Sequence, residues 1–352
     1  MASSDESAVA SRRRLLPLAV LVVATTVMAL TGCEPRSTKG EVVVYVSVDQ
    51  SYAEPVLARF EKQTGIEVRA VYDVEAAKTT GLAQRILAER SRPQADVFWN
   101  GELVHTVELA RAEALAVYRS PSAADLPDDV RDPAGRWAGC AGRVRVLVVS
   151  KDLPETEAPS SIADLVRSPV APDQIGISHP LFGTSATHAT ALYATLGPEE
   201  ALKLFTEVRR RGVRVTAGNS VVRDLVSRGQ LRFGLTDTDD SCQAIKRGAP
   251  VRIVVPDQGP EQHGAMVIPT TVGLVEGGPH PQLGRQLVDY LSSERVERML
   301  VAAGWSHAPV RELDISGPCF DLRQIKRMPI DATRLADVAP RARKELRDVF
   351  VR

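Results

Sequence analysis

Three carboxylates stand within four residues near the middle of the chain. The segment Thr236-Asp237-Thr238-Asp239-Asp240 follows a short apolar run and opens a helical pattern that continues to Lys246. Carboxylates this close repel one another, and a bound cation would relieve the repulsion. Helix capping is the structural alternative, because acids at the start of a helix complement its dipole. We expect Thr236 and Asp237 to bind ligand, and Asp239 and Asp240 to offer oxygen atoms to a metal ion.

Polar side chains also follow two earlier predicted strands. They are Ser47, Asp49 and Gln50 after the first strand, and Trp99, Asn100 and Glu102 after the third. Because ligands bind at the carboxyl ends of parallel strands, we expect these residues to line one site. Trp99 either offers its ring face to a cation or belongs to the core. Asp49 and Glu102 either contact a cation or stabilise the start of a helix.

Small polar residues begin two further predicted helices. They are Gly183-Thr184-Ser185 and Gly218-Asn219-Ser220. The free N–H groups of a helix N-terminus bind anions, so Gly183, Thr184, Ser185 and Asn219 are candidate anion ligands. Capping alone is the alternative explanation.

The elements that would position these residues alternate between strands and helices. The first group is strand 42–46, a helix from Ser51 to Gly65, strand 66–72, helix 81–92 and strand 95–99. The second group is strands 143–150 and 174–178, helices 185–196 and 198–211, strand 213–215, helix 219–228 and strand 232–235. The predicted strands 251–255 and 265–275 then lead the chain back to the first group of elements. This order predicts an α/β fold of two lobes, each a mainly parallel sheet flanked by helices, with the ligand cleft between them.

The predicted domain boundaries follow from this order. Residues 41–143 and 263–310 form lobe 1, residues 144–262 form lobe 2, and residues 311–352 form a C-terminal, helical extension with a helix near 340–349. Residues 33–40 are short and polar, as expected of a tether.

The first 33 residues have the parts of an export signal. Arg12-Arg13-Arg14 precedes an apolar run over residues 15–30, which ends in Leu30-Thr31-Gly32-Cys33. The ending is similar to the lipobox of bacterial lipoproteins, which implies that residues 1–32 are removed and that Cys33 is acylated. We therefore expect an exported protein, lipid-anchored to the membrane in the periplasm or at the cell surface. An uncleaved anchor helix is the alternative.

Composition excludes several classes of protein. The formal net charge is zero, so the chain has no general attraction for nucleic acid. Cys140, Cys242 and Cys319 are too few and too widely spaced to indicate a zinc motif, and the sequence does not show which two of them pair. Gly-x-Ser-x-Gly, His-Glu-x-x-His and P-loop motifs are absent, so we expect no enzyme. An exported enzyme with Asp237 and Asp239 as acid and base is the distant alternative.

Seven sequence segments, taken in their order along the chain, resemble the corresponding segments of a known family. They are Val44–Ser47, Phe60–Val68, Pro93–Asn100, Gly142–Val148, His179–Ser185, Gly218–Ser220 and Gly234–Asp240. Together they are similar to the extracellular solute-binding proteins of ABC importers, and within these to the ferric-ion-binding branch of the type II periplasmic binding proteins. The resemblance covers residues 41–310. It implies a monomer whose lobes close on a ligand by hinge motion and present it to an ABC permease in the membrane.

The positions that hold the metal in that branch carry other residues here. The first-loop His falls on Asp49, the Glu after the third strand falls on Gly101 with Glu102 one step beyond, and the Tyr pair falls on Asp239-Asp240. Carboxylates are hard oxygen ligands, as ferric ion prefers. The resemblance implies Fe³⁺ as the ligand, held by Asp49, Glu102, Asp239 and Asp240 with phosphate or carbonate as synergistic anion, and no resident cofactor. An organic cation such as a polyamine or thiamine, or a small anion, is the alternative ligand.

Overall fold

The computed structural model describes residues 39–73 and 80–351. The predictions of an export signal over residues 1–32 and of lipidation at Cys33 lie outside the described residues. Within the described ranges, every helix is too short or too polar to cross a lipid bilayer.

Nine strands of the described chain form one continuous network of pairings. They are β1 (Glu41–Val46), β2 (Glu67–Tyr72), β3 (Val97–Asn100), β4 (Ala138–Ser150), β5 (Ile175–Ser178), β6 (Arg214–Thr216), β7 (Phe233–Asp237), β8 (Val251–Val254) and β9 (Val267–Leu274). Their order is β2-β1-β3-β9-β4-β7-β5-β6, and β8 pairs with β4. The outer strands pair in parallel, whereas the pairs made by β4 and β9 are antiparallel.

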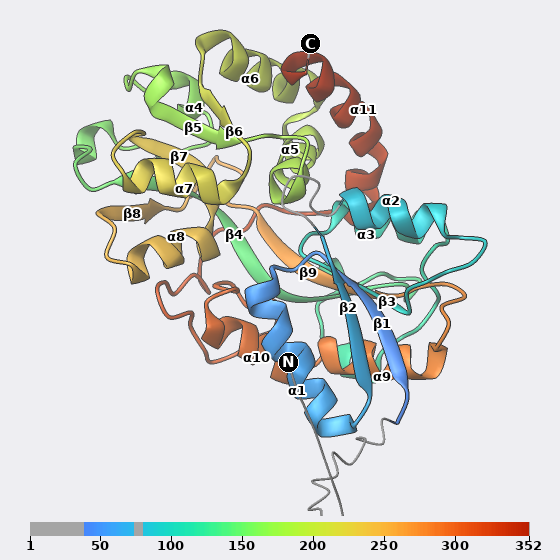
Figure 1. The fold of residues 1–352 in the computed structure, drawn as a ribbon. Coiled ribbons are helices and arrows are strands. Elements are labelled where there is room, and N and C mark those ends of the chain that lie inside the picture. Colours follow the sequence, from blue (N-terminus) through green and yellow to red (C-terminus); the bar gives the residue numbers. More distant parts are fainter. Residues whose placement is uncertain (1–38, 74–79, 352) are drawn as a thin grey trace, which may run out of the picture. The chain divides into compact units, whose positions relative to one another are not determined.

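Helices connect and flank these strands (Figure 1). They are α1 (Gln50–Thr64), α2 (Thr80–Ala88), α3 (Val104–Arg111), α4 (Asp164–Arg167), α5 (Gly183–Leu196), α6 (Pro198–Arg211), α7 (Asn219–Ser227), α8 (Thr238–Lys246), α9 (Pro281–Leu291), α10 (Glu294–Ala303) and α11 (Ala332–Phe350). Short 3-10 turns lie at Pro121–Ala123, Asp128–Val130, Glu155–Glu157 and Pro172–Gln174. The sequence did not predict α3, α4, α9 or α10. In addition, α2 ends before the predicted residue 92, and α11 begins before the predicted residue 340.

The helix α1 illustrates how the sequence dictates an element. Its side chains Val56, Leu57 and Phe60 recur at helical spacing and are buried against the sheet. The helix ends at Gly65, which has a φ of 74° and lies in the left-handed region. Glycine adopts this conformation without a steric penalty, so the chain can turn sharply into β2.

The long strand β4 joins two groups of strands. Residues from Ala138 to Val144 pair with β9, and residues from Arg145 to Val149 pair with β7. We call β1, β2, β3 and β9 the first strand group, and β5, β6, β7 and β8 the second strand group. Every residue of β4 is buried. The proposed lobe boundaries at residues 143/144 and 262/263 remain predictions.

The extension after residue 311 contains α11, which packs on helices of both parts of the chain. It contacts α3, α5 and α6, and Figure 1 shows it in red beside α5 and α6. Arg343 lies 2.6 Å from Glu108 of α3, and Arg341 lies 3.0 Å from Glu199 of α6. The helix therefore bridges the helices next to β3 and those next to β5.

The cysteine pairing that the sequence left open is between Cys242 and Cys319. Cys140 is a buried free thiol.

Candidate ligand-binding site

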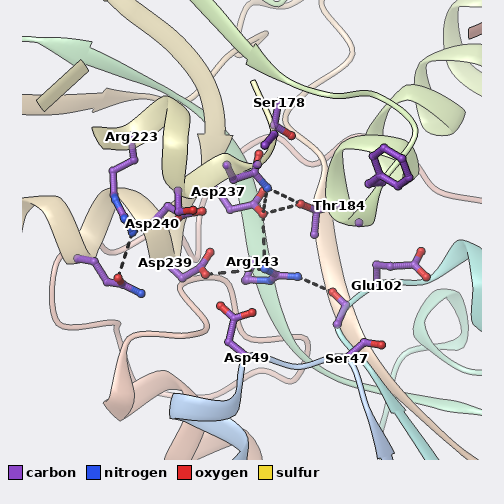
Figure 2. A pocket seen from close by; sticks show the side chains of 18 of the residues that line it. Ser47, Asp49, Glu102, Arg143, Ser178, Thr184, Arg223, Asp237, Asp239 and Asp240 are labelled. Atoms are coloured by element: carbon purple, nitrogen blue, oxygen red, sulfur yellow. Dashed lines mark hydrogen bonds and ion pairs between the residues drawn. The ribbon is translucent and has the colours of Figure 1, made fainter. Parts of the chain in front are cut away.

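Loops that follow β1, β3, β5, β6 and β7 meet around a cavity of about 320 Å³. Its lining includes most of the predicted site residues: Ser47, Asp49, Glu102, Gly183, Thr184, Asn219, Asp237, Asp239 and Asp240. Figure 2 shows the side chains of Ser47, Asp49, Glu102, Thr184, Asp237, Asp239 and Asp240 converging around Arg143. The carboxyl ends of the parallel strands thus bring distant segments to one place.

Five predicted site residues do not line this cavity in the described part of the chain: Gln50, Trp99, Asn100, Ser185 and Thr236. Gln50 is exposed on α1, whereas Trp99 is 1% exposed in the core that contains β1 and β9. Asn100, Ser185 and Thr236 are buried and bond to other residues of the site: Asn100 to Glu102, Ser185 to Asn219, and Thr236 to the Asn219 carbonyl. They support residues that line the cavity.

Asp237 ends β7, and Asp239 and Asp240 lie in the first turn of α8; one carboxylate oxygen from each of the three lies within 4.8 Å of the other two. Asp237 accepts hydrogen bonds from Arg145 at 2.7 Å, from Thr184 at 2.6 Å and from Asn219 at 3.0 Å. Burial raises the pKa of Asp237, but Arg145 and Arg143 outweigh it and hold the pKa below its ordinary value. Asp237 is therefore an ionised and fully engaged carboxylate.

Asp239, in contrast to Asp237, is only partly satisfied by its neighbours. Its Oδ1 atom is buried without a hydrogen-bond partner among the described residues, and its Oδ2 lies 3.8 Å from Arg143 Nη1. Burial raises the pKa of Asp239 well above its ordinary value, and the charges of Asp240, Asp237 and Asp49 add to this against the opposing Arg143. A cationic group that entered the cavity here would stabilise the ionised form.

Asp240 is paired with a third arginine, Arg223. Its Oδ1 lies 2.9 Å from Arg223 Nη1, which also donates to Gln243 at 3.1 Å. Gln243 in turn donates to Tyr52 of α1. These contacts connect α7 and α8 with α1 along one side of the cavity.

Two arginines of β4 belong to the site although the sequence analysis did not select them. Arg143 donates to the carbonyl of Gly101 at 2.5 Å and stacks on Trp305 at 4.0 Å. Its Nη1 lies 3.5 Å from Asp237. Both Arg143 and Arg145 are nearly inaccessible to solvent. Two arginines inside an otherwise apolar strand were the signal that could have found them, since buried charges need partners.

Glu102 lines the cavity but already has its own donors. It accepts hydrogen bonds from the backbone N–H of Val104 at 2.6 Å, from the ring of His105 at 3.0 Å and from Thr187 at 2.5 Å. Burial raises the pKa of Glu102, but His105 and the hydrogen bonds from Thr187 and Asn100 outweigh it and hold the pKa low. Its role as a metal ligand stays a prediction, as does that of Asp49.

The N-termini of α5 and α7 both face the cavity. Neither helix start carries a side-chain capping hydrogen bond within the described residues, and Gly183, Thr184, Gly218 and Asn219 line the cavity. Free N–H groups at these two ends can bind an anion. The cavity thus combines anion-binding helix ends with carboxylates.

Comparisons with known proteins agree with this arrangement. A family model described as bacterial extracellular solute-binding protein matches residues 42–306. The chain is 25% identical over 267 residues to a Salmonella typhimurium protein named "Putative 2-aminoethylphosphonate-binding periplasmic protein", covering 75% of each. It is 26% identical over 284 residues to the major ferric iron-binding protein of Neisseria meningitidis serogroup B, covering 78% of this chain and 82% of that one.

Solved structures share the fold. Iron-bound HitA from Pseudomonas aeruginosa matches with a TM-score of 0.79 and 22% identity, over 88% of this chain and 99% of that one. The periplasmic binding protein AfuA from Actinobacillus pleuropneumoniae, with bound fructose-6-phosphate, matches with a TM-score of 0.77 and 21% identity, over 89% and 99% of the two chains.

These likenesses confirm the predicted two-lobed α/β fold class and the expectation that the chain is no enzyme. They also support export from the cytoplasm and a role in delivering a ligand to an ABC permease. The chain belongs to the bacterial extracellular solute-binding proteins, within the type II branch that includes the ferric-ion-binding proteins.

Proposed function

We propose that this solute-binding protein captures a small zwitterion with a phosphonate or phosphate group at one end and an ammonium group at the other. The observation that carries the proposal is the composition of the cavity. Two uncapped helix N-termini and the carboxylates that follow β7 line the same space of about 320 Å³. A ligand with both charges would satisfy both parts.

The helix starts would hold the anionic end. The backbone N–H groups at the starts of α5 and α7 would donate hydrogen bonds to an anion bound there, and Thr184, Asn219 and Ser220 add polar side chains to this part of the cavity. Arg143 and Arg223 also line the cavity and supply positive charge. This part of the site would suit the tetrahedral oxygen atoms of a phosphonate.

The acids would hold the ammonium end. Asp239 has an oxygen atom without a partner among the described residues, and burial, together with the neighbouring carboxylates, raises the pKa of Asp239. Asp49 lines the same side of the cavity. An ammonium group placed between them would donate hydrogen bonds to a carboxylate that the protein leaves unsatisfied.

Ferric ion with phosphate or carbonate is the second candidate, favoured by the names of the Neisseria and Pseudomonas relatives. The contacts support it less well. Asp237 and Asp240 are already paired with arginines, and the Arg143 guanidinium lies next to Asp237 and Asp239, where it would repel a trivalent cation. A polyamine or thiamine without an anionic group would leave the two helix starts unused.

Isothermal titration calorimetry tests the choice of ligand. We expect saturable binding of 2-aminoethylphosphonate, and binding at least tenfold weaker for ethylphosphonate and for ethylamine, each of which lacks one charged end. Saturable binding of Fe³⁺ with phosphate, together with no response to the zwitterion, would overturn the proposal in favour of iron.

The route of delivery completes the proposal. We propose that Cys33 is acylated after removal of residues 1–32, so that the monomeric protein stays tethered to the membrane by residues 33–40. The two lobes would close on the ligand by hinge motion and present it to the permease. Fractionation of cells that express the protein and its Cys33→Ser variant tests the anchor. The variant should leave the membrane fraction.

A further inference from the structure

We propose that Cys242, Cys319 and His307 form a second binding site, separate from the ligand cavity, which takes up Cu(I) when the disulfide is reduced. The two sulfur atoms and a ring nitrogen of His307 all lie within 4.8 Å of one another. Cys242 belongs to α8, whereas His307 and Cys319 lie between α10 and α11. Among the described residues that line the ligand cavity, none of these three occurs.

His307 is the observation that points to a ligand. Its side chain is completely buried, and both of its ring nitrogens are without a hydrogen-bond partner in the described part of the chain. Buried polar groups in proteins are almost always hydrogen-bonded, so a buried imidazole whose two ring nitrogens both lack a partner among the described residues requires an explanation. A metal ion at the sulfur atoms would use one of them.

The imidazole is also held in place. Its ring packs against Phe320 with a centroid distance of 5.2 Å. On another side it touches Gly317, where an added Cβ atom would lie only 2.5 Å from His307 Cδ2. The ring therefore stays beside the sulfur atoms without a hydrogen bond to orient it. A metal site needs such fixed ligands, because each must keep its direction.

The disulfide decides whether the site exists. Cys319 is half-buried, whereas Cys242 is buried, so Cys319 is the more accessible residue of the disulfide. A thiolate of an exported dithiol oxidoreductase would attack Cys319 Sγ, and Cys242 would leave as a thiolate and take up a proton. The second thiol of the reductant would then displace Cys319, so that the reductant becomes a disulfide and this chain gains two thiols. Binding of the metal ion would release the two thiol protons.

The ligand set selects a soft metal ion. Two thiolates favour Cu(I) or Zn²⁺ over hard cations. Structural Zn²⁺ sites have four ligands, and the described residues here offer three. Cu(I) accepts three ligands, and two thiolates with Cu(I) carry one net negative charge. Lys246 supplies a positive charge close to the sulfur atoms. Its Nζ atom and Cys242 Sγ both lie beside Gly304, since a Cβ atom added to that glycine would be 3.2 Å from Nζ and 3.6 Å from Sγ.

Competition titration of Cu(I) against a bathocuproine chelator tests the proposal. The chain would carry Cys33→Ser and Cys140→Ser, so that Cys242 and Cys319 are its only cysteines. After reduction with a phosphine under argon, we expect one Cu(I) per chain, and none before reduction. His307→Phe should weaken binding at least tenfold, and Cys242→Ser or Cys319→Ser should abolish it. His263→Phe, at an exposed histidine, should leave the affinity unchanged.

Three results would overturn the proposal. They are equal Cu(I) affinity before and after reduction, equal affinity in a folded His307→Phe variant, and tighter binding of Zn²⁺ than of Cu(I). If His307→Phe does not fold, X-ray absorption of the copper-loaded parent decides. Two sulfur atoms and one nitrogen around copper support the site, and sulfur ligands alone reject it.

Discussion

Thr187 of α5 donates a 2.5 Å hydrogen bond to the buried carboxylate of Glu102, which follows β3. The bond joins residues 85 positions apart, one beside each strand group. The other donors to Glu102 in the described part of the chain lie nearby in the sequence, at Asn100, Val104 and His105. Thr187 is therefore the long-range anchor of this carboxylate.

Replacing Thr187 by Val should destabilise the protein, because the variant removes a hydrogen bond to a charged, buried group. Such bonds contribute about 2 kcal/mol to the free energy of unfolding. Thr190→Val on the same helix is the matched control, since among the described residues the Thr190 hydroxyl bonds only to the carbonyl of Ala186. Urea denaturation of both variants measures the difference. Equal losses of stability would contradict a special role for the bond to Glu102.

Asp239→Asn should weaken binding of 2-aminoethylphosphonate about tenfold or more, which corresponds to about 1.4 kcal/mol. The amide keeps the shape of the side chain but removes the negative charge that would face the ammonium group. Binding of ethylphosphonate, which has no ammonium group, should be unaffected. Asp173→Asn at an exposed position is the control. A parallel loss for both ligands in calorimetry would mean that Asp239 does not contact the ammonium end.

Arg143→Met should convert the acid cluster into a cation site. The guanidinium lies 3.5 Å from Asp237 and 3.8 Å from Asp239, so its removal lowers the positive charge beside both carboxylates, although Asp237 keeps its ion pair with Arg145. We expect Tb³⁺ luminescence to report binding at least tenfold tighter than in the parent protein. Arg214→Met, at an exposed position of β6, should not change it. Unchanged Tb³⁺ affinity in the Arg143 variant would show that this arginine does not keep cations away from the three aspartates.

The sequence predicts an element well where local signals agree. Helix α6 spans Pro198–Arg211, as predicted, because Gly197-Pro198 opens it and Gly212 ends it. Helix α9 was missed because Gly284 lies inside it, and glycine weakens a helical pattern. An added Cβ at Gly284 would lie 2.7 Å from Leu274 Cδ1, so the glycine lets α9 pack closely against β9.

The site was predictable in part for the same reason. Polar residues after strands gather at one edge of a sheet, which located Asp49, Glu102 and the three aspartates after β7. Their partners were not predictable, because the donors to Glu102 and Asp237 include Thr187 and Arg145, which lie far away in the chain. The sequence therefore indicated where charges gather but not which of them neutralise one another.

Stability should fall in mild acid because of His188, which is buried on α5. Burial, with the charge of Arg145 adding to it, lowers the pKa of His188 from 6.5 to about 3. Between these values the unfolded chain binds a proton that the folded chain does not. The stability present above pH 6.5 is therefore lost as the pH falls, by about 2 kcal/mol at pH 5. Urea denaturation of the parent and of His188→Gln at about pH 7.5 and about pH 5 measures this loss. The variant should show a smaller loss between the two pH values, whereas His263→Gln, at an exposed histidine, should behave like the parent. An identical pH dependence in His188→Gln would mean that the imidazole becomes protonated within the folded protein.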